Sequence, residues 1–146
     1  MIKFLKLILF SFFIINIFNV AFSKEEYFKK GLELYKNKKY DDAKFMFEKS
    51  IVFNPKNSHS YLYLAKIFNY KEDQNNEEKN LNTTLLIEPE NEEAILMLMK
   101  ISLEKSNYSK VKELSKKFSQ VCKKLCNENK KILENLDNIE PKNDSW

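Results

Sequence analysis

The residues of this chain that could take part in catalysis or metal binding are few and scattered. His59 is the only histidine, and the two cysteines, Cys122 and Cys126, are remote from it in the sequence. A structural zinc site usually needs four ligands at recognisable spacings, and a cysteine nucleophile with His59 as its base would lack a third group to orient that base. Gly31 is the only glycine, so no glycine-rich phosphate loop can form. The sequence therefore predicts no catalytic residue, no metal site and no cofactor, and a protein that is not an enzyme.

Pairs of acidic residues, which could act as general acids and bases, have a simpler explanation. Each pair stands at the start of a predicted helix, where negative charge interacts favourably with the helix dipole. The pairs are Asp41-Asp42, Glu77-Glu78 and Glu92-Glu93. Asn91, directly before the last pair, is predicted to cap the helix that follows it.

Apolar residues recur at intervals of three and four along the chain, which is typical of amphipathic helices. One glycine and three prolines leave little of the turn chemistry that β-hairpins need. The pattern predicts an all-α fold in which Pro55, Pro89 and Pro141 each follow a helix end. The predicted helices span residues 25–37, 41–54, 58–71, 75–88, 92–105, 108–122 and 126–139.

The spacing of particular residues indicates a repeat. Pro55 and Pro89 are 34 residues apart. Four residues precede Pro55 at the intervals of a repeat: an aromatic residue, a glycine, an alanine and a phenylalanine. These four are Tyr27, Gly31, Ala43 and Phe47. In this spacing the chain resembles a tetratricopeptide repeat (TPR) protein, whose unit is about 34 residues folded as helix–turn–helix. The resemblance implies a TPR-type solenoid, because one helix pair cannot bury its own apolar stripe and neighbouring pairs must stack.

Three repeats are expected, and they match the TPR pattern unequally. The predicted segments are residues 24–57, 58–91 and 92–125 for the repeats, 126–139 for a capping helix with a polar outer face, and 140–146 for a polar tail. The second repeat has Glu77 where the pattern has a small alanine. The third departs at four positions, which are Met99 for glycine, Val111 for alanine, Ser115 for phenylalanine and Lys123 for proline. We expect Met99 and Val111 to crowd the third helix pair.

The two cysteines stand where this arrangement predicts a turn. In a continuous helix, residues four apart have Cβ atoms about 5–6 Å apart, whereas a disulfide needs about 3.8 Å. A bond between Cys122 and Cys126 therefore requires the helix to break between them, as predicted at the end of the third repeat. The candidate disulfide would close that turn; the alternative is a pair of free, buried thiols.

The first 23 residues differ in composition from the rest. Lys3 and Lys6 precede an apolar run, and Ala21-Phe22-Ser23 places small residues where a signal peptidase reads them. This is typical of a cleaved secretory signal peptide. The alternative is an uncleaved membrane anchor, although the unbroken apolar run is shorter than the roughly 20 residues that a spanning helix needs. The sequence thus predicts export to the periplasm or the extracellular space.

The charge of the chain does not indicate a nucleic-acid partner. Removal of residues 1–23 takes two lysines from the 25 basic residues and leaves 23 against 21 acidic ones. The two signs are interspersed, so there is no basic surface that would attract nucleic acid. Contact with a membrane is expected only if the N-terminal segment stays uncleaved.

The resemblance implies that a protein or peptide partner binds in the concave groove lined by the first helix of each pair. On this chain that groove would be apolar and aromatic, with lysines at its polar points. Its candidate residues are Phe28, Leu32, Tyr35, Leu62, Tyr63, Lys66, Asn69, Tyr70, Leu96, Met97, Lys100 and Leu103. The alternative for each residue is packing within the stack or against the capping helix.

One subtype of TPR domain, which grips the C-terminal carboxylate of its partner, does not fit. Its members use lysine, asparagine and arginine at set positions. The matching residues here are Phe28, Leu32, Tyr63, Glu93 and Met97. The sequence therefore predicts an exported adaptor or scaffold with a different ligand, or alternatively a membrane-anchored structural or assembly subunit of a cell-envelope complex.

Overall fold

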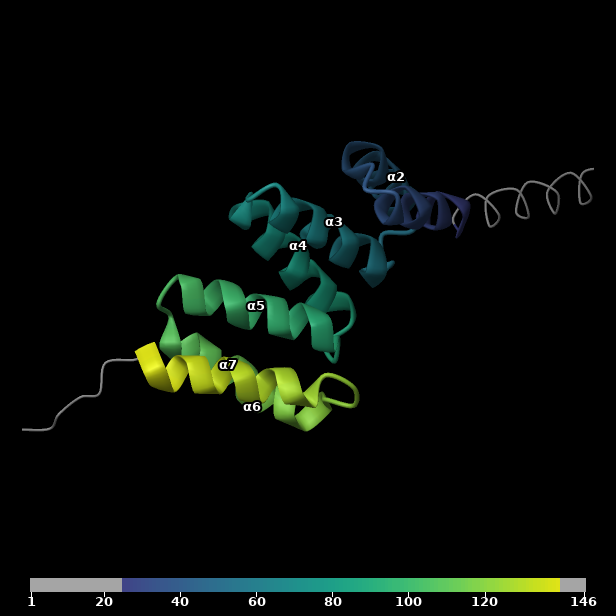
Figure 1. Ribbon diagram of the computed structural model, residues 1–146. Helices are drawn as coiled ribbons and strands as arrows, with labels where there is room; N and C mark the ends of the chain where they lie inside the picture. Colours follow the sequence, from purple (N-terminus) through teal and green to yellow (C-terminus); the bar gives the residue numbers. More distant parts are fainter. Residues whose placement is uncertain (1–24, 140–146) are drawn as a thin grey trace, which may run out of the picture. The chain divides into compact units, whose positions relative to one another are not determined.

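The computed structural model describes residues 25–139, and over that range all its regular structure is helical. A helix over residues 25–36 comes first. It is followed by α2 (Tyr40–Phe53), α3 (Ser58–Tyr70), α4 (Gln74–Ile87), α5 (Glu92–Glu104), α6 (Tyr108–Val121) and α7 (Cys126–Ile139) (Figure 1). Each helix begins and ends within one residue of its predicted bounds. The predicted signal peptide and polar tail lie outside the described residues.

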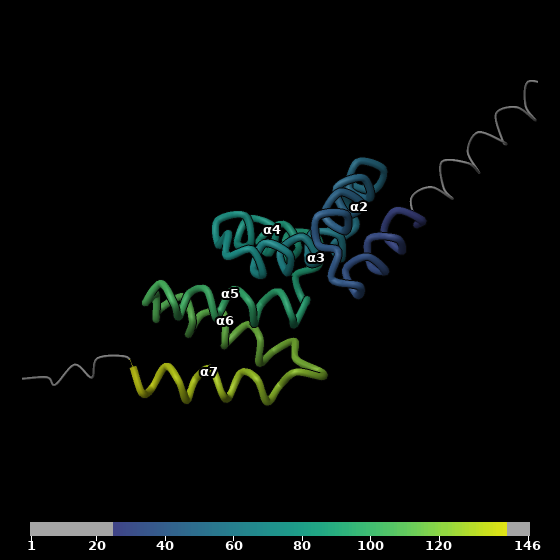
Figure 2. Tube along the Cα trace, turned by 45° about the horizontal axis from the view of Figure 1, so that its top comes forward, coloured from purple at the N-terminus to yellow at the C-terminus, as the bar shows by residue number. Residues whose placement is uncertain are grey.

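Among the helices of residues 25–139, none has the combination of length and hydrophobicity with which a chain crosses a bilayer. The chain divides between Tyr63 and Leu64, within α3, into two compact units. In the first unit the helix over residues 25–36 packs on α2. In the second, α5 contacts α4, α6 and α7, and the chain reverses direction at the turns that join α5, α6 and α7 (Figure 2).

The turn inside each helix pair has the same backbone conformation three times. Lys38, Glu72 and Ser106 have φ angles of 58°, 59° and 54°, in the left-handed region that residues other than glycine seldom adopt. The N–H of the next residue donates to a carbonyl five residues back, at 3.0, 3.0 and 2.8 Å, which is the bond of a Schellman motif. The three turns are 34 residues apart. The backbone thus repeats even where the side chains depart from the TPR pattern.

The second helix of each pair buries side chains at three equivalent positions. These are Ala43, Phe47 and Ser50 in α2, Glu77, Leu81 and Thr84 in α4, and Val111, Ser115 and Phe118 in α6. In α6 a small serine replaces Phe47, but Phe118 then replaces the small Ser50. The large side chain moves by one helical turn, and swaps that conserve volume are the ones a core tolerates best.

The lone glycine faces Phe47, one of the two phenylalanines among these side chains. A Cβ built on Gly31 would lie 2.8 Å from Cδ1 and Cε1 of Phe47, whose side chain is fully buried. The equivalent pairs in the other repeats are Ala65 with Leu81 and Met99 with Ser115. Across the three repeats, a larger side chain on the first helix thus goes with a smaller side chain at the equivalent position of the second helix. Met99 and Val111, which we expect to crowd the third pair, are both fully buried, and the two helices of that pair, α5 and α6, contact each other.

Replacing Gly31 with alanine is expected to lower the free energy of unfolding by about 1 kcal/mol. Overpacking costs about 1–3 kcal/mol, and the higher helix propensity of alanine returns about 1 kcal/mol. Combining Gly31→Ala with Phe47→Leu reproduces the pairing of Ala65 with Leu81 and should relieve the clash. Urea unfolding of both single variants and the double variant measures the coupling. An equal cost of Gly31→Ala in both backgrounds would contradict the packing argument.

Candidate functional site

Four aromatic rings gather where the helix over residues 25–36 meets α2 and the start of α3. Tyr63 stacks on Phe47 with ring centroids 5.2 Å apart, and Tyr35 meets the same tyrosine edge-on at 5.1 Å. Phe28 lies 6.1 Å from Tyr63 and 5.8 Å from Phe47. Phe47 is fully buried, whereas the other three are half-buried. We call these four residues the aromatic cluster; it brings together three of the predicted groove residues.

Two more side chains border the aromatic cluster. His59 is exposed and meets Phe28 edge-on at 6.1 Å, and Tyr40 meets Tyr35 edge-on at 5.4 Å. Leu32 is half-buried. Leu62, in contrast, is only 4 % exposed, so it belongs to the core and offers no side-chain surface to a partner.

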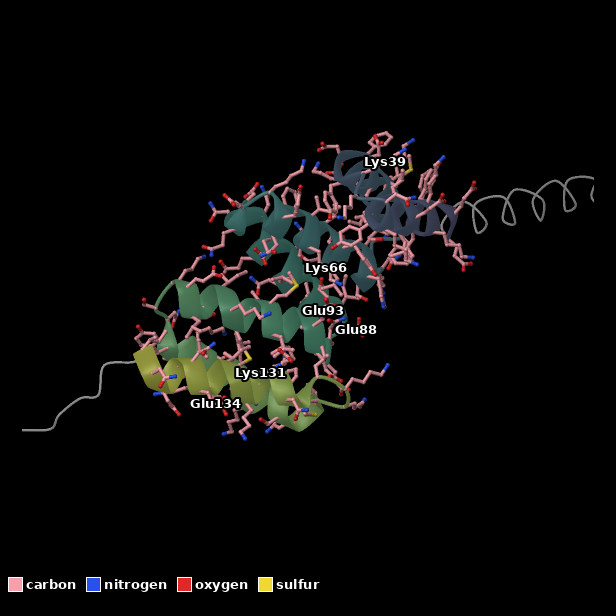
Figure 3. All side chains as sticks on the ribbon, viewed as in Figure 1. Lys39, Lys66, Glu88, Glu93, Lys131 and Glu134 are labelled. Carbon is pink, nitrogen blue, oxygen red and sulfur yellow. A yellow bond between two sulfur atoms is a disulfide. The ribbon has the colours of Figure 1, made fainter. Side chains whose placement is uncertain are left out.

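In the second unit, two predicted groove residues are engaged by acidic side chains. Lys66 of α3 forms an ion pair with Glu93 of α5, with Nζ 2.7 Å from Oε1, and the two side chains point toward one another (Figure 3). The amide nitrogen of Asn69 donates to both carboxylate oxygens of Glu77, at 3.1 and 3.2 Å. These polar groups therefore hold helices of the second unit together.

The bond from Asn69 explains how Glu77 takes the place of a small alanine. The Glu77 side chain is 4 % exposed, and burial raises the pKa of its carboxyl, an effect that the hydrogen bond from Asn69 opposes. A buried carboxylate needs such donors, because desolvation otherwise makes its charged form costly.

The remaining candidates of the second unit differ in exposure. Leu96 is 6 % exposed and lies in the core. Tyr70 is 65 % exposed, Lys100 is also exposed, and Met97 and Leu103 are half-buried. Of these remaining candidates, the accessible side chains are thus those of one aromatic, one cationic and two apolar residues; Asn69 is exposed as well, and Lys66 is half-buried.

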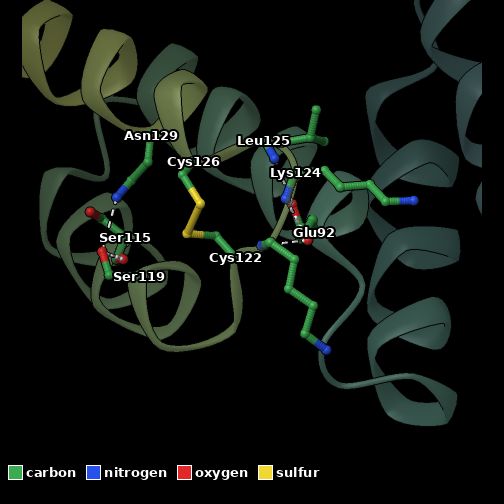
Figure 4. The surroundings of a disulfide bond; sticks show 9 residues. Glu92, Ser115, Ser119, Cys122, Lys124, Leu125, Cys126 and Asn129 are labelled. Carbon is green, nitrogen blue, oxygen red and sulfur yellow. Dashed lines mark hydrogen bonds between the residues drawn. A yellow bond between two sulfur atoms is a disulfide. The ribbon is translucent and has the colours of Figure 1, made fainter.

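The turn between α6 and α7 is closed by a disulfide between Cys122 and Cys126, whose Cα atoms are 5.4 Å apart (Figure 4). The helix breaks there, because α6 ends at Val121 and α7 begins at Cys126. The two earlier turns at this position contain Pro55 and Pro89, and this one contains Lys123 instead. We call residues 122–126 the stapled turn.

The carboxylate of Glu92, the first residue of α5, sits against the backbone of the stapled turn (Figure 4). The N–H groups of Lys123 and Leu125 each donate to it at 2.8 Å, and that of Lys124 donates at 3.1 and 3.3 Å. Proline at the position of Lys123 would lack the first donor. These hydrogen bonds, the one from Leu125 foremost, lower the pKa of the Glu92 carboxyl.

Replacing Glu92 with glutamine is expected to destabilise the fold at neutral pH and to matter less in acid. A carboxyl with a lowered folded-state pKa stabilises the fold above its unfolded pKa, near 4.5, and this contribution is lost as the pH falls through the lower folded value. Thermal unfolding between pH 3 and pH 7 measures the difference from the unsubstituted chain.

Glu90→Gln is the matched control, because its pair with Lys123 at 3.6 Å is mostly exposed and such pairs contribute little. A difference between Glu92→Gln and the unsubstituted chain that stays constant with pH would show that Glu92 does not act as a carboxylate acceptor.

The sequence placed Glu92 and Glu77 at helix starts, and Glu77 also at an alanine position of the repeat, but it identified the bonding partner of neither. Glu92 is in fact the first residue of α5, and Asn91 caps that helix as predicted, accepting from the N–H of Ala94 at 2.9 Å. The available signals were the missing proline at Lys123 and the acid at an alanine position. At both positions the residue typical of the repeat is missing, and a hydrogen-bonded carboxylate stabilises the structure there.

Comparison with known proteins places the fold. No protein-family model and no curated protein matches the sequence. The TPR2B domain of yeast Sti1 in complex with pHsp70 is similar in structure, with a TM-score of 0.72 and 12 % identity over 80 % of this chain and 97 % of that one. The type III secretion chaperone SycD of Yersinia enterocolitica, in complex with a peptide of the translocator YopD, is similar with a TM-score of 0.72 and 13 % identity, over 80 % of this chain and 94 % of that one. The TPR domain of Arabidopsis OM64 is similar with a TM-score of 0.68 and 20 % identity, over 80 % of this chain and 95 % of that one.

These likenesses extend over most of this chain and almost all of each TPR structure. Together with the 34-residue recurrence of the turns at Lys38, Glu72 and Ser106, they show that the chain has an all-α, TPR-type helix–turn–helix fold. At identities of 12–20 % they show the fold alone.

Proposed function

We propose that this chain is an exported adaptor or scaffold that binds a protein or peptide through the first helices of its helix pairs. The aromatic cluster carries the proposal. Phe28, Tyr35 and Tyr63 are half-buried rings held over a buried phenylalanine. Rigid aromatic side chains of this kind are enriched at the centres of protein interfaces.

The structural neighbours support the class of ligand. One is bound to pHsp70 and another to a peptide of the translocator YopD. The group that this chain binds should not be a C-terminal carboxylate. Of the residues at the positions that grip a carboxylate in other TPR domains, Phe28 and Tyr63 are aromatic, and Glu93 is acidic and paired with Lys66. An extended segment with apolar side chains fits these positions better.

Affinity capture from the producing cell, with the cluster variant Tyr35→Ala beside the unsubstituted chain, tests the proposal. Tyr35 is half-buried and lies at the edge of the aromatic cluster, so its removal should weaken capture while the helix content measured by circular dichroism is kept. Phe45→Ala is the matched control, since Phe45 is an exposed ring of α2 outside the cluster. Equal capture by all three chains would reject the cluster as the binding surface.

Export is tested separately, by cell fractionation with mass spectrometry of the N-terminus. A soluble exported adaptor should be recovered without residues 1–23. Recovery in membranes with those residues attached would favour the second candidate, an anchored subunit of an envelope complex. That candidate is supported by the apolar composition of the segment.

A further inference from the structure

The first unit exposes apolar side chains on α2, away from the stripe that α2 buries. Phe45 is 52 % exposed, Val52 76 % and Phe53 40 %. Phe45, Lys49 and Val52 follow one another at intervals of four and three residues and so share a helix face. Tyr27, from the preceding helix, stacks on Phe53 with ring centroids 5.2 Å apart and planes 13° apart. We call these five residues the Tyr27 face.

We propose that the Tyr27 face lies in the headgroup layer of the lipid bilayer into which residues 1–23 insert, with Lys49 at anionic phospholipid headgroups. The inference rests on the second candidate of the proposed function, in which residues 1–23 stay attached to the chain, and is independent of the partner that the aromatic cluster binds.

The length of the chain puts this face near the bilayer. Tyr27 is four positions after Ser23, and an extended chain spans at most about 3.6 Å per residue, so Tyr27 lies within about 14 Å of Ser23 in any conformation. The apolar run, interrupted by Asn16 and Asn19, continues to Phe22. While that run is inserted, Tyr27 and the Phe53 ring stacked on it are therefore within reach of the headgroup layer, into which interfacial segments sink about 5–10 Å.

The side chains of the face have the chemistry of a membrane interface. Aromatic rings concentrate at the level of the headgroups, and lysine extends its cation to the polar side while its stem contacts apolar groups. Lys49 has its Nζ 4.5 Å from the ring centroid of Phe45 and 5.4 Å from that of Tyr27. The cation is thus held among the rings, where it can meet an anionic headgroup.

Acidic side chains border the face. Glu25 and Glu26 directly precede Tyr27, and Glu25 forms an ion pair with Lys29. Asp41 and Asp42 stand in the first turn of α2 and bound the face at that end. Glu48, the other acid of α2, forms an ion pair with Lys44, which limits its repulsion of anionic lipid.

Quenching of tryptophan fluorescence by brominated phospholipids tests the proposal on the full chain in vesicles. The reporter is Phe45→Trp in a chain that also carries Trp146→Phe, so that it contains one tryptophan. Leu86→Trp in the same background is the matched control, because Leu86 is an apolar side chain of α4 that is 83 % exposed. Vesicles of phosphatidylcholine, with and without phosphatidylglycerol, provide the lipid.

We expect brominated lipid to reduce the emission of the Phe45→Trp reporter about twofold and to leave the Leu86→Trp control nearly unchanged, as burial in the interface implies. Phosphatidylglycerol should strengthen the quenching, and Lys49→Gln should abolish that increase. Equal quenching of both reporters, or none at position 45, would overturn the proposal. So would failure of the chain to float with vesicles. Shielding of the reporter that depends on protein concentration would identify a second copy of the chain as the occupant instead.

Discussion

Phe47→Ala is expected to lower the free energy of unfolding by about 3–5 kcal/mol, the usual cost of removing a buried phenylalanine. The Phe47 ring is completely buried, stacks on Tyr63 and packs beside Phe28. It also fills the space that Gly31 leaves open. A loss of this size is a large part of the 5–15 kcal/mol that holds a typical domain together, so the first unit should unfold at markedly lower urea concentration.

Phe45→Ala provides the control for that experiment. Phe45 is two residues away on the same helix and is 52 % exposed, so its removal deletes the same atoms with little loss of packing. Its effect should stay within about 0.5 kcal/mol, as for most surface substitutions. Hydrogen exchange then locates the damage: the helix over residues 25–36 and α2 should lose protection. If the two alanine variants unfolded alike, burial of Phe47 could not be what stabilises the first unit.

Loss of the disulfide between Cys122 and Cys126 is the second large effect. Replacing both cysteines with serine should cost about 2 kcal/mol, the value that the chain-entropy model gives for so short a loop. The stapled turn also presents three backbone N–H groups to Glu92. A looser turn should hold the carboxylate less well, so the acid-dependent stabilisation by Glu92 should shrink in the same variant.

The capping helix α7 should show the damage most clearly. It contacts α5 and α6 and buries Ile132 and Leu136 at 5 % and 1 % exposure, and it begins at one of the bonded cysteines. Its amide protection should therefore fall first in the serine variant. A reducing agent should bring the unsubstituted chain to the same unfolding midpoint and leave the serine variant unmoved. If the reducing agent did not change the unfolding midpoint of the unsubstituted chain, the disulfide would not stabilise the fold.

The helices and their turns could be predicted because their causes are local. The interval of three and four between apolar residues defines each helix face, and Pro55 and Pro89 mark helix ends that any tertiary context must respect. The repeat could be predicted for the same reason, because the 34-residue spacing is a property of the sequence alone. The boundaries were therefore found to within one residue even in the third repeat, where most of the characteristic side chains are absent.

The candidate site was predicted less well, because burial and pairing depend on neighbours that sequence does not identify. Leu62 and Leu96 were placed in the groove by analogy and lie in the core. Asn69 and Lys66, which were assigned to a partner, bond Glu77 and Glu93 within the chain. Helical periodicity tells which residues share a face, but it cannot tell which of them a second helix will cover.

By itself, the sequence determined the helices, the repeat length and the place where the two cysteines could meet, since each follows from spacing along the chain. Only the tertiary structure decided how the repeats fit together internally. The ring of Phe47 fills the place of the missing Cβ at Gly31, and Glu92 binds a turn that lacks its proline. These are contacts between residues 16 to 33 positions apart in the chain, and packing in three dimensions, rather than local preference, selects among the many such pairs that the sequence would allow.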